Sequence, residues 1–401
     1  MSQTQATPSR ASLVSGSGFF LFVLLITAAN LRTPITATGP ILENICRTFN
    51  LNAAAAGLLN FIPLLMFALL APASSWLGNR LGLEKTLWGA IWLITLGSVL
   101  RITGSATGLW LGTLTLSSGI AAANVLLPPL IKRDFKDHTA RYIGLYAATM
   151  AITASIASGI AVPLAQATRA GWFLSVGIWL IPAIIALVAW LPALKDNGRS
   201  VSQQSSVSSP RLRSPWGSAL GWQVSIFMAL QSMVFYTLIA WFTPYAQEHG
   251  FSQANAGWLL FIYQAVAVAA NLACMVALKK LRDQRLVGFI ASLAIFSGLA
   301  GLLLAPAFAA LWLIVAGLGA GASIVICLSL FSLRAGDHRQ ASQLSGMAQC
   351  VGYALAALGP LVFGLLHESF HSWQVPLTAL LAMSLLQMIV APLAGREKQI
   401  G

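Results

Sequence analysis

Long apolar stretches, each about 20 residues, recur along almost the whole chain and are separated by short polar segments. A helix of about 20 residues spans the roughly 30 Å hydrocarbon core of a bilayer and satisfies its own backbone hydrogen bonds there. The pattern therefore predicts an all-α membrane protein. We expect twelve transmembrane helices, over residues 18–40, 54–78, 86–103, 107–131, 142–166, 171–192, 220–246, 254–278, 286–305, 309–333, 342–366 and 373–394.

One polar segment interrupts this pattern between the sixth and seventh apolar stretches. It is rich in serine and has no apolar period, which is typical of a flexible linker. The chain is therefore expected to form a six-helix bundle over residues 1–194, a linker over 195–219 and a second six-helix bundle over 220–401.

The two predicted bundles resemble each other in sequence. The second stretch begins AGLLNFIPL at Ala56, and the eighth begins AGWLLFIYQ at Ala256. An Asp-His pair at residues 137 and 138 recurs at 337 and 338. Parallel repeats of this kind are known in transporters, where the substrate site lies near the membrane midplane between the halves.

Composition and charge support a membrane protein and fix its expected orientation. Hydrophobic residues make up 57% of the 401 residues and charged residues only 8%. When loops are assigned to alternate sides, one side receives 19 of the 23 lysines and arginines. The positive-inside rule makes that side cytoplasmic and places both termini there. The net charge of +13 thus reflects topology, and we expect no nucleic acid partner.

Signatures of catalysis and metal binding are absent from the sequence. The four cysteines lie far apart and form no C-x-x-C pair, so we interpret them as packing residues and expect no metal or cofactor. The motifs G-x-S-x-G, H-E-x-x-H and the P-loop do not occur. The chain is therefore expected to be neither an enzyme nor an ATP-driven pump.

Arg32 is the one ionisable side chain predicted deep inside a span. It lies about 20 Å from the cytoplasmic edge at roughly 1.5 Å per residue, while all ten acidic residues fall in loops or at span ends. A lone arginine at that depth costs about 2.5 to 3.5 kcal/mol. An anionic or oxygen-rich substrate would complete the site, because a guanidinium forms a planar fork of donors. The alternatives are snorkelling to the outer headgroups, or bonding to carbonyls freed by Pro34.

Other polar side chains at similar depth are candidates for the same substrate site. Each is also suited to a hydrogen bond between helices, and the sequence does not choose between these roles. Trp241 and Phe242, near the end of the seventh span, are interpreted as interfacial anchors. The candidates that we assign to substrate binding with Arg32 are Asn30, Thr36, Asn60, Asn124, Gln231, Tyr236, Tyr263, Gln264, Gln349 and Tyr353.

The loop after the second span resembles a family signature. It reads GNRLGLEK from Gly78 and is similar to a degraded form of the D-R-x-G-R signature of the major facilitator superfamily. Arg80 and Gly82 match that signature, whereas Asn79 and Leu83 depart from it. The resemblance implies a conformational role for Arg80 and Gly82. It also implies the twelve-helix fold of two bundles that rock about a central site.

Three further segments narrow the resemblance. NLRTPITATGP from Asn30, ANVLLPPLIKRDF from Ala123 and LSGMAQCVGY from Leu344 are similar to the branch that holds cyanate and 2-nitroimidazole transporters, with the stronger similarity to the 2-nitroimidazole exporters. The similarity runs through nearly the whole chain.

That resemblance implies a secondary active transporter of the bacterial inner membrane for a small anionic or nitro-bearing solute. Its expected partners are a small-molecule substrate and membrane lipid, and we expect a monomer. The alternative is a sensor or assembly protein that retains the carrier fold but does not transport.

Overall fold

The computed structural model describes residues 11–134, 139–195, 214–278, 283–336 and 338–400. Most of the predicted linker lies outside these residues, as do residues 1–10 and the Asp-His pair at 137 and 138. The predicted bounds of the two halves therefore remain predictions.

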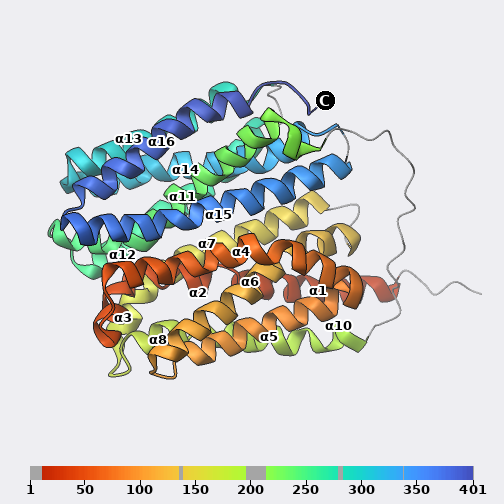
Figure 1. The fold of residues 1–401 in the computed structure, drawn as a ribbon. Coiled ribbons are helices and arrows are strands. Elements are labelled where there is room, and N and C mark those ends of the chain that lie inside the picture. Colours follow the sequence, from red (N-terminus) through yellow and green to blue (C-terminus); the bar gives the residue numbers. More distant parts are fainter. Residues whose placement is uncertain (1–10, 135–138, 196–213, 279–282, 337, 401) are drawn as a thin grey trace, which may run out of the picture.

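The described chain folds into helices that run back and forth in an elongated bundle (Figure 1). The first half contains α1 (Ala11–Ala29), α2 (Thr33–Thr36), η1 (Gly39–Ile41), α3 (Leu42–Phe49), α4 (Ala53–Leu81), α5 (Leu83–Arg101), α6 (Ala106–Asp134), α7 (Thr139–Ala167), α8 (Trp172–Gly177), α9 (Leu180–Ala189) and α10 (Leu191–Lys195). The second half contains η3 (Pro215–Gly217), α11 (Ala219–Glu248), α12 (Gln253–Leu278), α13 (Arg285–Leu304), η4 (Pro306–Phe308), α14 (Ala309–Leu333), α15 (His338–Phe370) and α16 (Gln374–Ala394).

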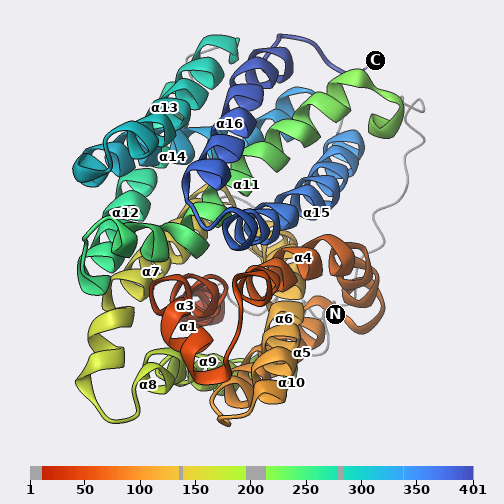
Figure 2. The ribbon, with the colours of Figure 1, turned by 60° about the vertical axis from the view of Figure 1, so that its left-hand side comes forward.

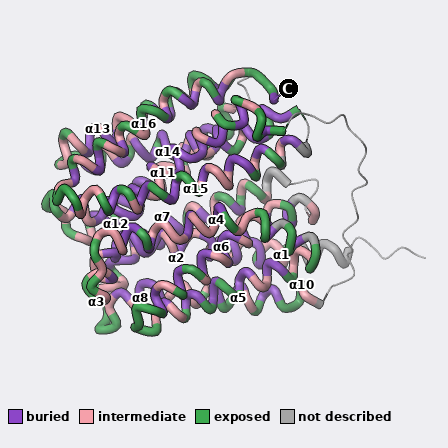
Figure 3. Tube along the Cα trace, in the orientation of Figure 1, coloured by how far each residue is buried: buried purple, intermediate pink, exposed green. Residues whose placement is uncertain are grey.

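Twelve segments of the described chain are long and apolar enough to cross a membrane, which confirms the predicted fold class. The first differs from its prediction, because it continues to Phe49 and is broken in the middle. Exposed positions follow the outer faces of the helices, where large apolar side chains such as Leu69, Ile181 and Leu286 are more than half exposed (Figure 3). Such a surface suits lipid.

The helix ends gather at two opposite faces of the molecule. We call the face that holds residues 195 and 214, at the two ends of the linker, the linker face. We call the opposite face, which holds the ends of α3 and α8, the far face (Figure 1). Figure 2 brings the far face forward and shows the second half of the chain above the first.

The apolar cores are arranged differently near the two faces. One buried cluster combines residues of both halves, among them Ile41, Ala56 and Trp172 with Trp241 and Leu260. A second cluster belongs almost wholly to the first half, and a third consists only of residues of the second half. The two halves thus share one core toward the far face and keep separate cores elsewhere.

The repeated Ala-Gly pairs occupy matching places at the interface between the halves. Gly57 of α4 lies so close to α15 that an added Cβ would stand 2.9 Å from the carbonyl oxygen of Pro360. Gly257 of α12 packs in the same way on α7, where a Cβ would stand 3.4 Å from the carbonyl oxygen of Ser158. Small residues at these positions let the helix backbones approach closely.

The interpretation of Trp241 and Phe242 as interfacial anchors is wrong. Both side chains are buried in the shared core, with exposed fractions of 4% and 2%. The indole nitrogen of Trp241 donates a hydrogen bond to the carbonyl oxygen of Pro360 at 2.8 Å. This hydrogen bond joins α11 to α15 within the shared core.

Candidate functional site

The first span breaks at residues 30–32, between α1 and α2. Pro34 has no amide hydrogen, and its ring conflicts with a helical carbonyl four residues earlier, at Asn30. Thr33 compensates in part, because its Oγ1 donates to the carbonyl oxygen of Ala29 at 2.9 Å. Arg32 caps α2 with backbone angles φ −124° and ψ −31°, outside the helical region. The break therefore directs the Arg32 side chain out of the regular helix line.

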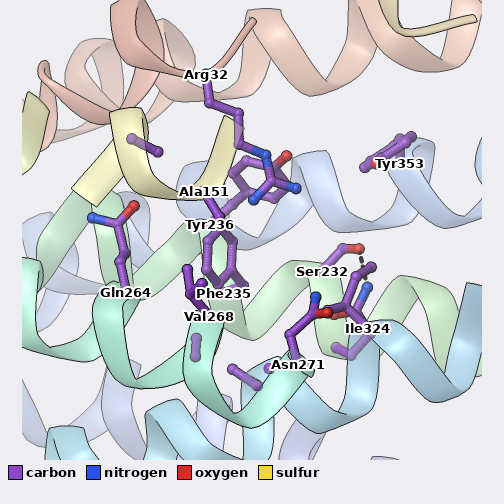
Figure 4. A pocket seen from close by; sticks show the side chains of 15 residues that line it. Arg32, Ala151, Ser232, Phe235, Tyr236, Gln264, Val268, Asn271, Ile324 and Tyr353 are labelled. Atoms are coloured by element: carbon purple, nitrogen blue, oxygen red, sulfur yellow. Dashed lines mark hydrogen bonds between the residues drawn. The ribbon is translucent and has the colours of Figure 1, made fainter. Parts of the chain in front are cut away.

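Arg32 points into the space between the two halves (Figure 4). Its Cζ atom lies over the ring of Phe235, 5.5 Å from the ring centroid, which is a cation–π distance. Among the described residues no carboxylate lies within ion-pair distance, and the guanidinium donates no hydrogen bond. The hydrogen-bond donors of this cation are therefore open to the cavity.

The main cavity has a volume of about 580 Å³ and is lined by helices of both halves. A smaller cavity of about 320 Å³ adjoins Arg32, Tyr236 and Tyr353 as well. These three residues line both cavities and thus stand between them.

Seven of the predicted site residues line one or both cavities. Some of them are already held by protein partners: the Gln264 amide donates to Ser158 Oγ at 2.7 Å, and the Asn124 amide oxygen accepts from the Tyr146 hydroxyl at 3.0 Å. The seven are Arg32, Thr36, Asn124, Gln231, Tyr236, Gln264 and Tyr353.

Four predicted residues do not line these cavities. The amides of Asn30 and Asn60 donate to carbonyl oxygens one turn earlier, at Ile26 and Ala56. The Gln349 amide donates to Ser345 Oγ, also one turn earlier. Tyr263 is fully buried and packs beside Phe235, with ring centroids 5.9 Å apart. Local acceptors on their own helices therefore account for the three amides.

The sequence analysis missed several lining residues, of which Asn271 is the most informative. It lies two helical turns after Gln264 in α12, and spacing by seven residues places both on one helix face. This spacing, visible in the sequence, could have identified Asn271 as a residue of the same cavity wall as Gln264. Ser232 and Phe235 also line the main cavity, and Phe67 lines the smaller one.

The sequence analysis singled out Arg32 as the one ionisable side chain deep inside a span, but Arg101 is buried more completely than the half-buried Arg32. Arg101 is the last residue of α5 and is 2% exposed. Its guanidinium donates to the carbonyl oxygen of Pro34 and to Oγ1 of Thr38, each at 2.9 Å. Burial is tolerated because the broken first span supplies acceptors that a continuous helix would use internally.

Arg334, just after α14, is likewise buried, at the linker face. It donates to the side chain of Gln284 and to the carbonyl oxygens of Ala394 and Gly395. Burial lowers the pKa of its guanidinium below the ordinary value. This arginine ties the end of α14 to the end of α16.

The signature-like loop lies at the linker face. Arg80 is exposed and stacks over Trp76, with Cζ 4.7 Å from the ring centroid, and Gly82 adopts a positive φ of 92° that ends α4. The neighbouring Glu84 pairs with Arg133, which also binds Asp134 at 2.7 Å. Hydrogen bonds to Asp134 and to Glu84 raise the pKa of the Arg133 guanidinium. Glu84 is thus the residue through which this loop forms an ion pair, with Arg133.

Two titratable side chains of α15, Glu368 and His367, lie near the far face. Glu368 of α15 accepts hydrogen bonds from the Asn52 amide and from the backbone N–H of Ala54, both at 3.0 Å, and so bridges to the start of α4. His367 stacks on Trp373 with ring centroids 3.8 Å apart. Among the described residues no group of three or more His, Cys, Asp or Glu side chains is placed to hold a metal ion.

Comparison with known proteins gives closely related sequences over most of the chain. An uncharacterized transporter of Bacillus subtilis is 38% identical, over 94% of this chain and 93% of that protein. The 2-nitroimidazole transporter of Escherichia coli is also 38% identical, over 94% of this chain and 95% of its own length. The cyanate transport protein of the same organism is 26% identical, over 87% of this chain and 90% of its own length.

The fold also matches solved transporter structures. A bacterial homologue of the human lysosomal transporter Spinster, in an inward-facing and occupied conformation, superposes with a TM-score of 0.77 at 16% identity and covers 97% of both chains. At this identity the match concerns the fold alone. The Major Facilitator Superfamily model matches residues 17–357, and the chain therefore belongs to the Major Facilitator Superfamily.

Proposed function

We propose that this protein is a secondary active transporter that moves a small anionic or nitro-bearing solute across the bacterial inner membrane by alternating access. In this proposal the linker face and both termini are cytoplasmic, as the positive-inside rule requires. The chain is a carrier rather than an enzyme. Its relatives named for 2-nitroimidazole and cyanate support this solute class.

One observation carries the proposal: the guanidinium of Arg32 faces a cavity between the halves without a carboxylate partner among the described residues. Arg32 is half-buried, and a charge drawn partly out of water is stabilised when it is paired or hydrogen-bonded. A cyanate ion neutralises the charge, and a nitro group offers two oxygens to the donor fork. Thr36, Asn124, Gln231, Tyr236, Gln264 and Tyr353 would complete the substrate site.

Counterflow of labelled cyanate or 2-nitroimidazole in proteoliposomes tests this proposal. Removal of one partner of a buried charged pair costs about 2–5 kcal/mol, so Arg32→Ala is expected to slow exchange about 30-fold or more. Arg32→Lys keeps the charge but loses the planar fork, and we expect an intermediate rate. Arg169→Ala is the matched control, because Arg169 is exposed in the loop before α8.

Exchange at the wild-type rate by Arg32→Ala, at equal protein content, would remove Arg32 from the site. A wild-type protein that binds one of these solutes but never exchanges it would instead favour the transport-dead sensor.

A further inference from the structure

The main cavity has one wall made of aromatic rings. Phe235 and Tyr236 of α11 pack edge to face at 5.3 Å, and Tyr236 meets Tyr353 of α15 at 6.5 Å. Phe67 of α4 continues the series on Tyr353 at 5.4 Å. Three helices from both halves therefore contribute to one aromatic surface, and all of these residues line one of the two cavities beside Arg32.

Arg32 adds a planar cation to this wall. Because Phe235 covers the guanidinium from one side, the N–H donors that remain open are those at its edge. A carboxylate that accepts two such N–H bonds lies in the plane of the guanidinium. A full negative charge also neutralises the unpaired cation, whereas a neutral nitro group does not.

A second open polar group lines the same cavity. The amide of Asn271 is half-buried and forms no hydrogen bond with any described residue. The neighbouring amides differ in this respect, since Gln231 donates to Ser232 and Gln264 donates to Ser158, each at 2.7 Å. Figure 4 shows Arg32 and Asn271 entering the cavity from opposite sides.

From this arrangement we infer that the cavity selects a flat aromatic carboxylate with a polar group at the far end of its ring. The carboxylate pairs with Arg32, the ring packs against Tyr236 and Tyr353, and the polar group meets Asn271. This inference rests on the proposed function, because it takes the Arg32 cavity as the substrate site. Conjugation keeps an aromatic carboxylate in the plane of its ring, so the whole solute fits beside a flat wall. Cyanate has three atoms in line and touches few of these rings.

Calorimetric titration of the purified full-length protein with four probes tests the inference: 4-aminobenzoate, benzoate, cyclohexanecarboxylate and cyanate. Benzoate and cyclohexanecarboxylate have equal charge and similar size, but only benzoate is flat. We expect benzoate to bind about threefold to tenfold more tightly, which is the usual contribution of aromatic pairs. The amino group should add a similar factor through Asn271. Cyanate should bind least well.

Two variants separate the parts of the site. Tyr353→Leu, in the wall against which the ring is inferred to pack, is expected to weaken benzoate binding about threefold or more and to leave cyclohexanecarboxylate nearly unchanged. Phe289→Leu is its control, because Phe289 is 37% exposed on α13. Asn271→Ala should remove the advantage of 4-aminobenzoate over benzoate without weakening benzoate itself.

The outcomes distinguish this inference from the proposed function. Equal affinities for benzoate and cyclohexanecarboxylate, or no binding of either aromatic probe, would overturn the aromatic class. The proposed function would still stand in that case if Arg32→Ala abolished cyanate or 2-nitroimidazole exchange. Unchanged benzoate binding by Arg32→Ala would overturn the inferred orientation.

Discussion

The interface between the halves differs at its two ends. Toward the far face the halves share one apolar core and are joined by hydrogen bonds, such as those of Glu368 with Asn52 and Ala54, and of Gln253 with Pro40. Toward the linker face each half keeps its own core, and the cavity lies between them. The interface is therefore closed at the far face, and in the proposed alternating-access mechanism this arrangement would be one of two states.

Backbone contact explains how the far end closes so tightly. An added Cβ at Gly39 would stand 2.1 Å from the carbonyl oxygen of Ile239, and one at Gly364 would stand 2.7 Å from that of Ala53. Contacts of this kind exist only while the halves are together. In an alternating-access carrier they must break in the opposite state, so far-face variants should shift the balance between the two states.

The largest effect is expected from Arg101, whose guanidinium binds the segment that follows the break in the first span, at Pro34 and Thr38. Arg101→Met removes two hydrogen bonds from a charged donor, to Pro34 and Thr38, and we expect a loss of about 3–6 kcal/mol in stability. Thermal unfolding in detergent measures this loss. Arg169→Met should leave the melting temperature almost unchanged. A variant as stable as the wild type would show that the segment holds its shape without Arg101.

Gly39→Ala should have the next largest effect, because the clash with Ile239 involves backbone that cannot rotate away. We expect the substitution to destabilise the state that is closed at the far face by about 1–3 kcal/mol. The population of that state relative to the open state would then fall roughly 5- to 150-fold. A cysteine placed at the fully buried Ala256, in a background without native cysteines, reports opening through its rate of maleimide labelling. Gly89→Ala is the control, since a Cβ there meets open space. Equal labelling in both variants would contradict a closed far face.

Glu368→Gln should give the smallest of the three effects. It keeps the shape of the side chain but removes the negative charge beside the first turn of α4, which is worth about 1 kcal/mol. Labelling at position 256 should rise about fivefold. Glu397→Gln, exposed near the linker face, should not change it. If both variants label alike, the carboxylate does not contribute to closure.

The sequence predicted the twelve spans well because each depends only on local apolar length. It did not predict the continuation of the first span through its break to Phe49, because the acceptors and donors that stabilise the broken segment come from α5 and α7. Depth along a helix can be counted from the sequence. The direction of a side chain around the helix depends on neighbours that the sequence does not reveal.

The site residues illustrate this limit. Arg32 was recognised because a charge inside a span is rare, whereas Asn60 and Gln349 were indistinguishable by depth from Gln231 and Gln264. Only the packing of the halves shows which amides reach the cavity. Arg101 was not singled out for a related reason: it ends its span, and its burial depends on acceptors in a different helix.

The unpaired cation at Arg32 has an electrical consequence. One elementary charge that crosses 100 mV of membrane potential changes the free energy by about 2.3 kcal/mol. An empty cavity holds a net positive charge, and a bound monovalent anion cancels it. The conformational return of the empty carrier is therefore expected to be voltage-dependent and to carry current, while the loaded step is electrically silent.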